Sequence, residues 1–152
     1  MTPSSAPATR QTPVTVRVFT QRFSSTPRGA RLARRLALHQ LDTWGVPYGS
    51  ETSDAAALLV AELAANAVTH GRVLGRDFEV ALKLVGQTLR IEVSDTRGEL
   101  RPHGPGAPHS VFPPLAETGR GMLLVEALAD RWDVLDRVPV GKTVVAELDL
   151  RS

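Results

Sequence analysis

The feature that most constrains this chain is a long apolar stretch interrupted by two polar residues. From Ala55 to Val68 every residue is Ala, Leu or Val except Glu62 and Asn66. A helix that is apolar on all sides is expected to be buried over most of its surface. Glu62 and Asn66 are four residues apart, so they stack on one helix face, with His70 one step further along. Buried polar groups need partners, so the pattern fits either a satisfied core pair with a helix-end histidine, or a site for a ligand or metal.

The first third of the chain is strongly basic. Residues 1–50 contain seven arginines and a single acidic residue, a net charge of +6, whereas the remainder of the chain carries −4. Four of the arginines lie close together: Arg28, Arg31, Arg34 and Arg35. They form either a solvated face or a docking surface for an acidic partner or nucleic acid. Nucleic acid is the less favoured partner, because no aromatic side chains that could stack on bases accompany these arginines.

Composition excludes several classes of protein. The chain has no cysteine, which excludes disulfides and thiolate metal sites, and its four histidines are too scattered to suggest a zinc cluster. No apolar run approaches the roughly 18 residues of a transmembrane helix, and the N-terminus lacks the apolar core of a signal peptide. We therefore expect a cytoplasmic protein with no membrane anchor. A disordered tail, residues 1–13, should precede a single domain, residues 14–152.

Hydrophobic periodicity predicts the elements of the first half of the domain. Val14 to Phe19 alternates valines with polar residues, as expected of a half-buried strand at a sheet edge. Thr26 followed by Pro27 predicts a helix start, and Gly45 predicts its end. The apolar stripe of this helix consists of Ala33, Leu36, Ala37, Leu41 and Trp44. A turn-rich link then leads to the apolar helix, which ends at Gly71.

The second half is predicted to contain two hairpins and a helix. The strands Phe78–Val85 and Leu89–Ser94 alternate in hydrophobicity and are joined by Gly86-Gln87. The segment MLLVEALADRW has a helical pattern, and WDVLDRV and KTVVAELDL form a closing hairpin. The apolar side of that helix is expected to carry Leu123, Leu124, Ala127 and Leu128. This order predicts an α+β two-layer sandwich, with helices on one face of a mixed, mostly antiparallel sheet.

A glycine- and proline-rich segment, Asp95 to Gly121, separates the first hairpin from the last helix. A loop of this length in a compact domain is usually functional or disordered. It ends in Gly119-Arg120-Gly121 immediately before the helical pattern. Glycines at a helix start leave backbone amides that can approach a phosphate, although this signal is weak by itself.

Three separated features follow one another in a fixed order. They are Glu62 with Asn66 on a buried helix, Asp95 at the end of a central strand, and the GRG sequence at a helix start. With the phrases ELAANAVTHG, ETGRGMLLVEALADRWDV and GKTVVAEL, they make the chain resemble the Bergerat-fold (GHKL) ATPases. Within that superfamily it looks most like the small anti-sigma factor serine kinases and related ATP-binding regulators. The resemblance extends from Val14 to Leu150.

The resemblance implies roles for three polar residues. Asn66 would coordinate a Mg²⁺ ion bound to the ATP triphosphate, because Mg²⁺ retains waters and needs few protein ligands. Glu62 would be the base that accepts a proton from the attacking hydroxyl or water. Asp95 would accept a hydrogen bond from the adenine amino group, which selects ATP over GTP.

The resemblance also implies a set of residues around the nucleotide. Gly98 would let the backbone approach the base, and Thr143 would complete the adenine pocket. Phosphates would be held by the segment Gly119, Arg120, Gly121 and Met122, beneath a lid formed by Arg101 to Thr118. Arg97 stands where the family's second motif, Asp-x-Gly-x-Gly, usually has its first glycine.

Two functions are compatible with these residues. The first is an ATP- and Mg²⁺-dependent protein serine kinase that phosphorylates an anti-sigma-antagonist protein, sequesters a sigma factor, or does both. The second is a nucleotide-gated protein-binding module with little or no kinase activity, for which the altered second motif argues. The resemblance also implies that two copies can pair as a homodimer.

Overall fold

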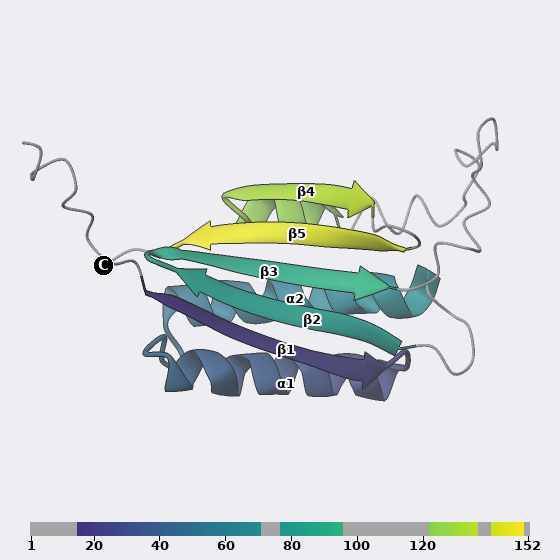
Figure 1. Cartoon of the computed structure of the whole chain (residues 1–152), viewed down its shortest axis with the longest axis horizontal. Coiled ribbons are helices and arrows are strands. Elements are labelled where there is room, and N and C mark those ends of the chain that lie inside the picture. The colour runs from purple at the N-terminus through teal and green to yellow at the C-terminus, as the bar shows by residue number, and fades with distance from the viewer. Residues whose placement is uncertain (1–14, 71–76, 96–121, 137–140, 151–152) are drawn as a thin grey trace, which may run out of the picture.

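Five strands form one antiparallel sheet, and helices cover one of its faces (Figure 1). The structure is a computed structural model that describes residues 15–70, 77–95, 122–136 and 141–150. The strands are β1 (Val16–Ser24), β2 (Asp77–Val85), β3 (Thr88–Asp95), β4 (Arg131–Asp136) and β5 (Lys142–Asp149), in the spatial order β1-β2-β3-β5-β4. Every pairing between these described strands is antiparallel. This architecture confirms the predicted α+β two-layer sandwich.

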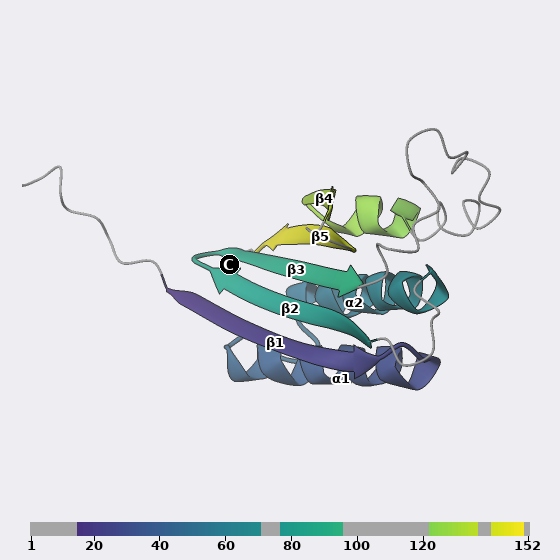
Figure 2. The same ribbon diagram turned by 45° about the vertical axis from the view of Figure 1, so that its right-hand side comes forward.

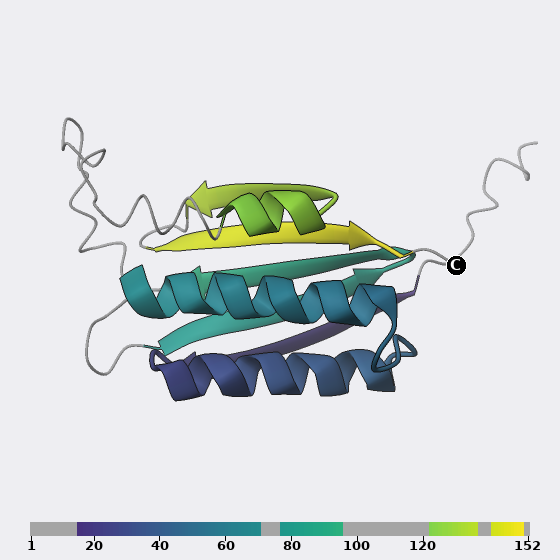
Figure 3. The same ribbon diagram turned by 180° about the vertical axis from the view of Figure 1, so that it is seen from behind.

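The helical layer contains α1 (Pro27–Thr43), α2 (Glu51–His70) and a shorter helical segment, residues 122–128. The view from behind shows α1 in front of β1, α2 in front of the central strands, and the short segment in front of β5 and β4 (Figure 3). The turned view shows that the opposite face of the sheet carries no helix in the described part of the chain (Figure 2). We call these two sides the helix face and the open face of the sheet.

The hydrophobic core lies between the two layers, as the predicted alternation requires. On β2 the residues Phe78, Val80, Leu82 and Leu84 are buried, and on β3 so are Leu89, Ile91 and Val93. They pack against Leu59, Val60 and Leu63 of α2 and against the buried stripe of α1. The hairpin between β2 and β3 turns at Gly86, whose φ of 62° is the left-handed conformation that glycine adopts most easily.

Both ends of α1 are fixed by local hydrogen bonds, in agreement with the predicted boundaries. At its start, the Thr26 hydroxyl accepts a hydrogen bond from the Gly29 N–H at 2.9 Å, and Pro27 occupies the first turn. At its end, Gly45 adopts a φ of 93°. The Gly45 N–H bonds to the Asp42 carbonyl and the Val46 N–H to the Leu41 carbonyl, which is the Schellman pattern of a glycine-ended helix.

Helix α2 begins four residues before the predicted apolar run. Ser50 provides the reason, because its hydroxyl accepts a hydrogen bond from the Ser53 N–H at 3.2 Å and so caps the helix. Glu51 and Asp54 lie in the first turn, where negative charge favours the helix dipole. One side of the helix is buried, with Leu59, Val60 and Leu63 at 0–1% exposure, whereas Leu58 on the other side is 44% exposed. The helix is therefore less enclosed than its composition predicts, and its described part ends at His70.

The first strand lies at the sheet edge as predicted, but its orientation is different from the one its valines suggest. Val16 and Val18 are 58% and 56% exposed, on the open face. The opposite side of β1 contributes Phe23, which is buried and stacks on Phe78 with ring centroids 5.7 Å apart. Strand β1 also continues to Ser24. Its aromatic residues, and not its valines, therefore attach it to the core.

The short helix also faces the core with a different side from the predicted one. Leu123 is 66% exposed, whereas Val125 is completely buried. Met122, Leu128 and Ala129 pack beside Val125 against the core. The helical residues end at position 128, so that Arg131 begins strand β4 and does not extend the helix.

Some predicted features lie outside the described residues. They are the tail, residues 1–13, nearly all of the Asp95–Gly121 loop with its lid segment, and most of the turn between the last two strands. Within the described helices, none combines the length and apolarity that crossing a membrane requires.

Candidate functional site

A small cavity opens where α2, β3, β5 and the short helix meet. Its described walls consist of Leu63, Asn66, Ala67, Val93, Asp95, Met122, Lys142 and Val144. The cavity volume is about 30 Å³, whereas pockets that hold a whole small molecule are on the order of 300–1,000 Å³. These residues therefore form the floor of a larger site or a water-sized hole. Their composition, four aliphatic walls with a thioether, a carboxylate, an amide and an ammonium, is typical of a ligand site.

Asn66 is the polar residue that α2 contributes to this cavity. Its Nδ2 atom is buried and has no hydrogen-bond partner in the described part of the chain. A buried amide without a partner is destabilising unless something else satisfies it. Rotation of the amide exchanges Oδ1 and Nδ2, so either atom can occupy the buried position. An amide oxygen at this position fits the preference of Mg²⁺ for oxygen ligands.

Asp95 lies across the cavity from α2, at the end of β3. The register pairs it with Lys142, the first residue of β5. Side chains alternate along a strand, so both residues point to the helix face together with Val93 and Val144. Sheet pairing thus unites Asp95 with a residue 47 positions later in the sequence, and α2 places Asn66 opposite them.

The comparison with known protein families places the chain in one family. Residues 23–148 match the family model described as Histidine kinase-like ATPase domain, which covers most of the chain. The chain belongs to the histidine kinase-like ATPase family. No curated protein matches the chain. Because the matched region extends from β1 to β5, it includes every described wall of the cavity.

As a histidine kinase-like ATPase domain, the protein has the Bergerat fold and binds ATP. Three residues that the sequence assigns to the nucleotide site, Asn66, Asp95 and Met122, line one cavity in the structure. They come from three different elements, separated by up to 56 residues along the chain. The described residues hold no group of three or more His, Asp or Glu side chains that could bind a metal by themselves. A cation here would depend on Asn66, water and the nucleotide.

Glu62 does not line the cavity. It lies one helical turn before Asn66 and is half-buried, so it is less enclosed than the apolar sequence around it suggests. No hydrogen bond or ion pair joins its carboxylate to another side chain in the described ranges. A carboxylate in this position can reach a substrate that enters from outside the cavity.

Thr143 is adjacent to the cavity but is turned away from its described walls. Its hydroxyl is buried and lies 2.7 Å from the Ser94 hydroxyl. These two residues are register partners one position from Asp95 and Lys142, so their side chains alternate to the other face of the sheet. The predicted contact of Thr143 with adenine remains a prediction. Four further predicted positions lie outside the described residues: Gly98, Gly119, Arg120 and Gly121.

Lys142 is the cavity residue that sequence reasoning missed. It lies in the phrase GKTVVAEL, to which the resemblance assigned only Thr143, and its pairing with Asp95 across β3 and β5 brings it to the site. The apolar walls Leu63, Ala67, Val93 and Val144 were predicted as core positions, and they also line the cavity.

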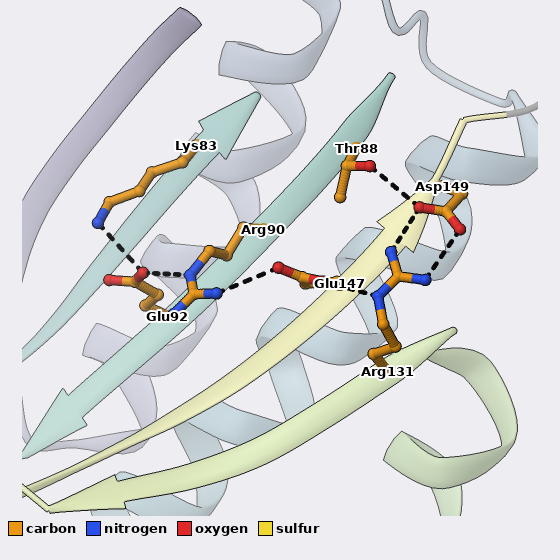
Figure 4. A network of polar contacts seen from close by, with 7 residues as sticks. All are labelled: Lys83, Thr88, Arg90, Glu92, Arg131, Glu147 and Asp149. Carbon is orange, nitrogen blue, oxygen red and sulfur yellow. Dashed lines mark hydrogen bonds and ion pairs between the residues drawn. The ribbon is translucent and has the colours of Figure 1, made fainter. Parts of the chain in front are cut away.

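The open face of this ATPase domain carries a different polar cluster, which Figure 4 shows. Its cations and carboxylates alternate across four strands. Lys83 and Arg90 bond to Glu92 at 3.1 and 2.6 Å, and Arg90 continues to Glu147 at 3.1 Å. Arg131 bonds to Glu147 at 2.8 Å and to Asp149 at 2.6 Å. Thr88 completes the chain by donating to Asp149 at 3.0 Å.

The pKa values in this open-face network shift in the directions that favour the charged forms of the ion-paired groups. Burial raises the pKa of Glu92, but the hydrogen bonds from Arg90 and Lys83 outweigh it and hold the pKa below its ordinary value. The hydrogen bond from Arg131 lowers the pKa of Glu147. The bonds to Asp149 and Glu147 raise the pKa of Arg131. All these groups remain charged near neutral pH, so the network stabilises the sheet and supplies no acid or base.

Proposed function

We propose that this protein is an ATP- and Mg²⁺-dependent protein serine kinase of the anti-sigma regulatory type. Its substrate would be a serine of an anti-sigma-antagonist protein, and a sigma factor would be a second partner that it sequesters. The observation that carries the proposal is Asn66, whose buried Nδ2 has no hydrogen-bond partner among the described residues. Asn66 lines the same cavity as Asp95 and lies one turn after the carboxylate of Glu62.

In this proposal each polar residue of the site has one task. The Asp95 carboxylate accepts a hydrogen bond from the adenine amino group and fixes the base against β3 and β5. The Asn66 amide oxygen holds Mg²⁺, which neutralises charge on the triphosphate. Leu63, Ala67, Val93 and Val144 provide apolar walls that exclude water from the base.

Glu62 would act on the acceptor. The serine oxygen forms a bond to the γ-phosphorus as the bond from that phosphorus to the bridging oxygen of ADP breaks. The serine proton passes to the Glu62 carboxylate. Half-burial supports this role, because a base for a protein substrate must be reachable from outside the cavity and yet lie near the bound triphosphate.

The partner would dock on the exposed arginines of α1. Arg28, Arg31, Arg34 and Arg35 are all exposed, and none forms an ion pair with another described residue. Cations in the first turns of a helix oppose its dipole, so they do not serve helix stability. An acidic protein surface would supply the missing counter-charges and accelerate association.

A second candidate function is a nucleotide-gated binding module without useful catalysis. It is favoured by the replacement of a motif glycine by Arg97. In this function ATP would still bind to Asn66 and Asp95. The partner would dock on the same arginines, but no phosphate would reach it.

Labelled ATP separates the two functions. Purified protein is incubated with γ-labelled ATP, Mg²⁺ and candidate anti-sigma-antagonist proteins, and the label on the partner is measured. A kinase labels a serine of the partner, and Glu62→Gln abolishes the label while ATP affinity is retained. The matched control is Glu51→Gln, an exposed carboxylate in the first turn of the same helix, which should label normally.

Equal labelling by wild type and Glu62→Gln would exclude Glu62 as the base. ATP-dependent binding of a partner without any label on it would support the binding module and overturn the kinase. To test the docking surface, Arg31→Glu combined with Arg35→Glu should weaken partner binding at least tenfold while ATP affinity is unchanged.

A further inference from the structure

We propose that Lys142 is a base-recognition residue. Its ammonium group donates a hydrogen bond to a ring nitrogen that flanks the 6-amino group of adenine, beside the bond that Asp95 accepts. This inference rests on the ATP site proposed above and adds to it a residue that determines specificity.

The placement of Lys142 is the first argument. Its backbone is paired directly with that of Asp95, so the two Cα atoms are about 4.5–5.5 Å apart. Both side chains alternate to the helix face, and both line the cavity. Two polar groups fixed on neighbouring strands can contact adjacent atoms on the edge of one flat ligand.

Charge is the second argument. Among the eight described residues that line the cavity, Lys142 is the only cation and Asp95 the only anion. A surface lysine is usually solvated, but Lys142 is half-buried among apolar walls. No ion pair joins its ammonium to a carboxylate in the described ranges. We therefore expect a ligand that binds in the cavity to offer a hydrogen-bond acceptor to the Lys142 ammonium.

The chemistry of purines is the third argument. Adenine has an amino group at position 6, which only donates, and unprotonated nitrogens at positions 1 and 7 on either side of it. A carboxylate only accepts and an ammonium only donates. With Asp95 at the amino group, Lys142 meets one of these ring nitrogens. Guanine has an oxygen at position 6, which the Asp95 carboxylate would repel.

The test measures ATP affinity calorimetrically for the full chain and for Lys142→Met and Lys142→Arg. Three ligands are compared: ATP, 1-deaza-ATP and 7-deaza-ATP, each with Mg²⁺. For the wild type, one of the two deaza analogues should bind about tenfold more weakly than ATP, because it lacks the acceptor for a charged donor. Lys142→Met should bind ATP about tenfold more weakly than the wild type does. It should also lose the wild-type preference for ATP over the weaker-binding deaza analogue. Lys142→Arg should retain much of the preference.

Lys83 provides a matched control, because it is the only other lysine in the chain. It lies on the open face, where it bonds to Glu92. Lys83→Met should therefore leave the affinities for all three ligands unchanged. A change equal to that of Lys142→Met would indicate a general effect of charge and overturn the inference.

The outcomes separate this inference from the proposed function. If the wild type binds ATP and both analogues equally, Lys142 does not contact the base and the inference is wrong, whatever the variants do. If Lys142→Met lowers affinity but keeps the wild-type preference, Lys142 acts on the phosphates or the fold, and the inference is again wrong. If the wild type does not bind ATP, the nucleotide site and this inference fail together, whereas absence of phosphoryl transfer alone affects only the kinase proposal.

Discussion

Asn66 lies one helical turn after Glu62 on α2, but only Asn66 reaches the cavity that Asp95 lines. The two polar residues that interrupt the apolar helix are thus divided between an enclosed position and an accessible one. In the proposed kinase, this division would suit the two tasks of phosphoryl transfer, which are to hold the triphosphate firmly and to admit a second substrate.

Substitution of Asn66 should separate stability from binding. Asn66→Ala removes an amide whose buried Nδ2 has no partner among the described residues, and it introduces a better helix former. We expect its free energy of unfolding in urea to equal or exceed that of the wild type by up to about 1 kcal/mol. In titrations with and without Mg²⁺, the variant should lose the Mg²⁺-dependent part of ATP affinity. Gln40→Ala, which removes an amide from α1, should leave ATP binding unchanged.

The orientation of the short helix predicts opposite results for two neighbouring substitutions. Val125→Ala empties a fully buried position and should lower the free energy of unfolding by about 2 kcal/mol. Leu123→Ala affects an exposed side chain and should change the free energy of unfolding by no more than about 0.5 kcal/mol. Chemical denaturation of both variants checks this. A larger loss for Leu123→Ala would contradict the observed orientation.

Stability should fall in acid because of the open-face network. The pKa values of Glu92 and Glu147 lie below their ordinary value of 4.5 in the folded protein. Groups with a lowered folded-state pKa stabilise the fold above the unfolded-state pKa and lose that contribution as pH falls through the folded-state pKa. The free energy of unfolding should therefore decline from about pH 5 downward. The double variant Glu92→Gln, Glu147→Gln should show a flatter decline, and an unchanged slope would contradict the assignment.

Gly29 should not tolerate alanine, although alanine usually favours a helix. A Cβ atom at Gly29 would lie 2.0 Å from the Ser24 carbonyl oxygen and 2.8 Å from the Ser24 hydroxyl. The junction between β1 and α1 would have to open. We expect Gly29→Ala to lower the free energy of unfolding by about 1–3 kcal/mol, measured by thermal or urea unfolding. Arg31→Ala, at an exposed position in the same helix, serves as the control and should have little effect.

Where local chemistry decides the structure, the sequence predicts it well. Thr26, Pro27 and Gly45 define α1 because capping and left-handed glycine conformations depend only on adjacent residues. The hairpin of β2 and β3 is predicted because each strand has a clearly apolar side. The family resemblance adds Asn66, Asp95 and Met122, which the structure brings to one cavity.

Where two sides of an element are similarly apolar, sequence reasoning chooses the wrong one. In β1 the alternating valines form a regular pattern, yet the larger Phe23 on the other side buries more surface and determines the orientation. In the short helix, Leu123, Leu124, Val125 and Leu128 spread around most of the circumference, so periodicity does not identify the buried side. Lys142 was missed for another reason, since only the β3–β5 register brings it to Asp95.

That register has a consequence for how such domains can diversify. Eight consecutive residue pairs fix β5 against β3, from Thr88 with Asp149 to Asp95 with Lys142. The relative position of the last pair is thus independent of the length of chain that joins the two strands. Insertions or deletions between them can change the surroundings of the cavity while the Asp95–Lys142 pairing stays the same.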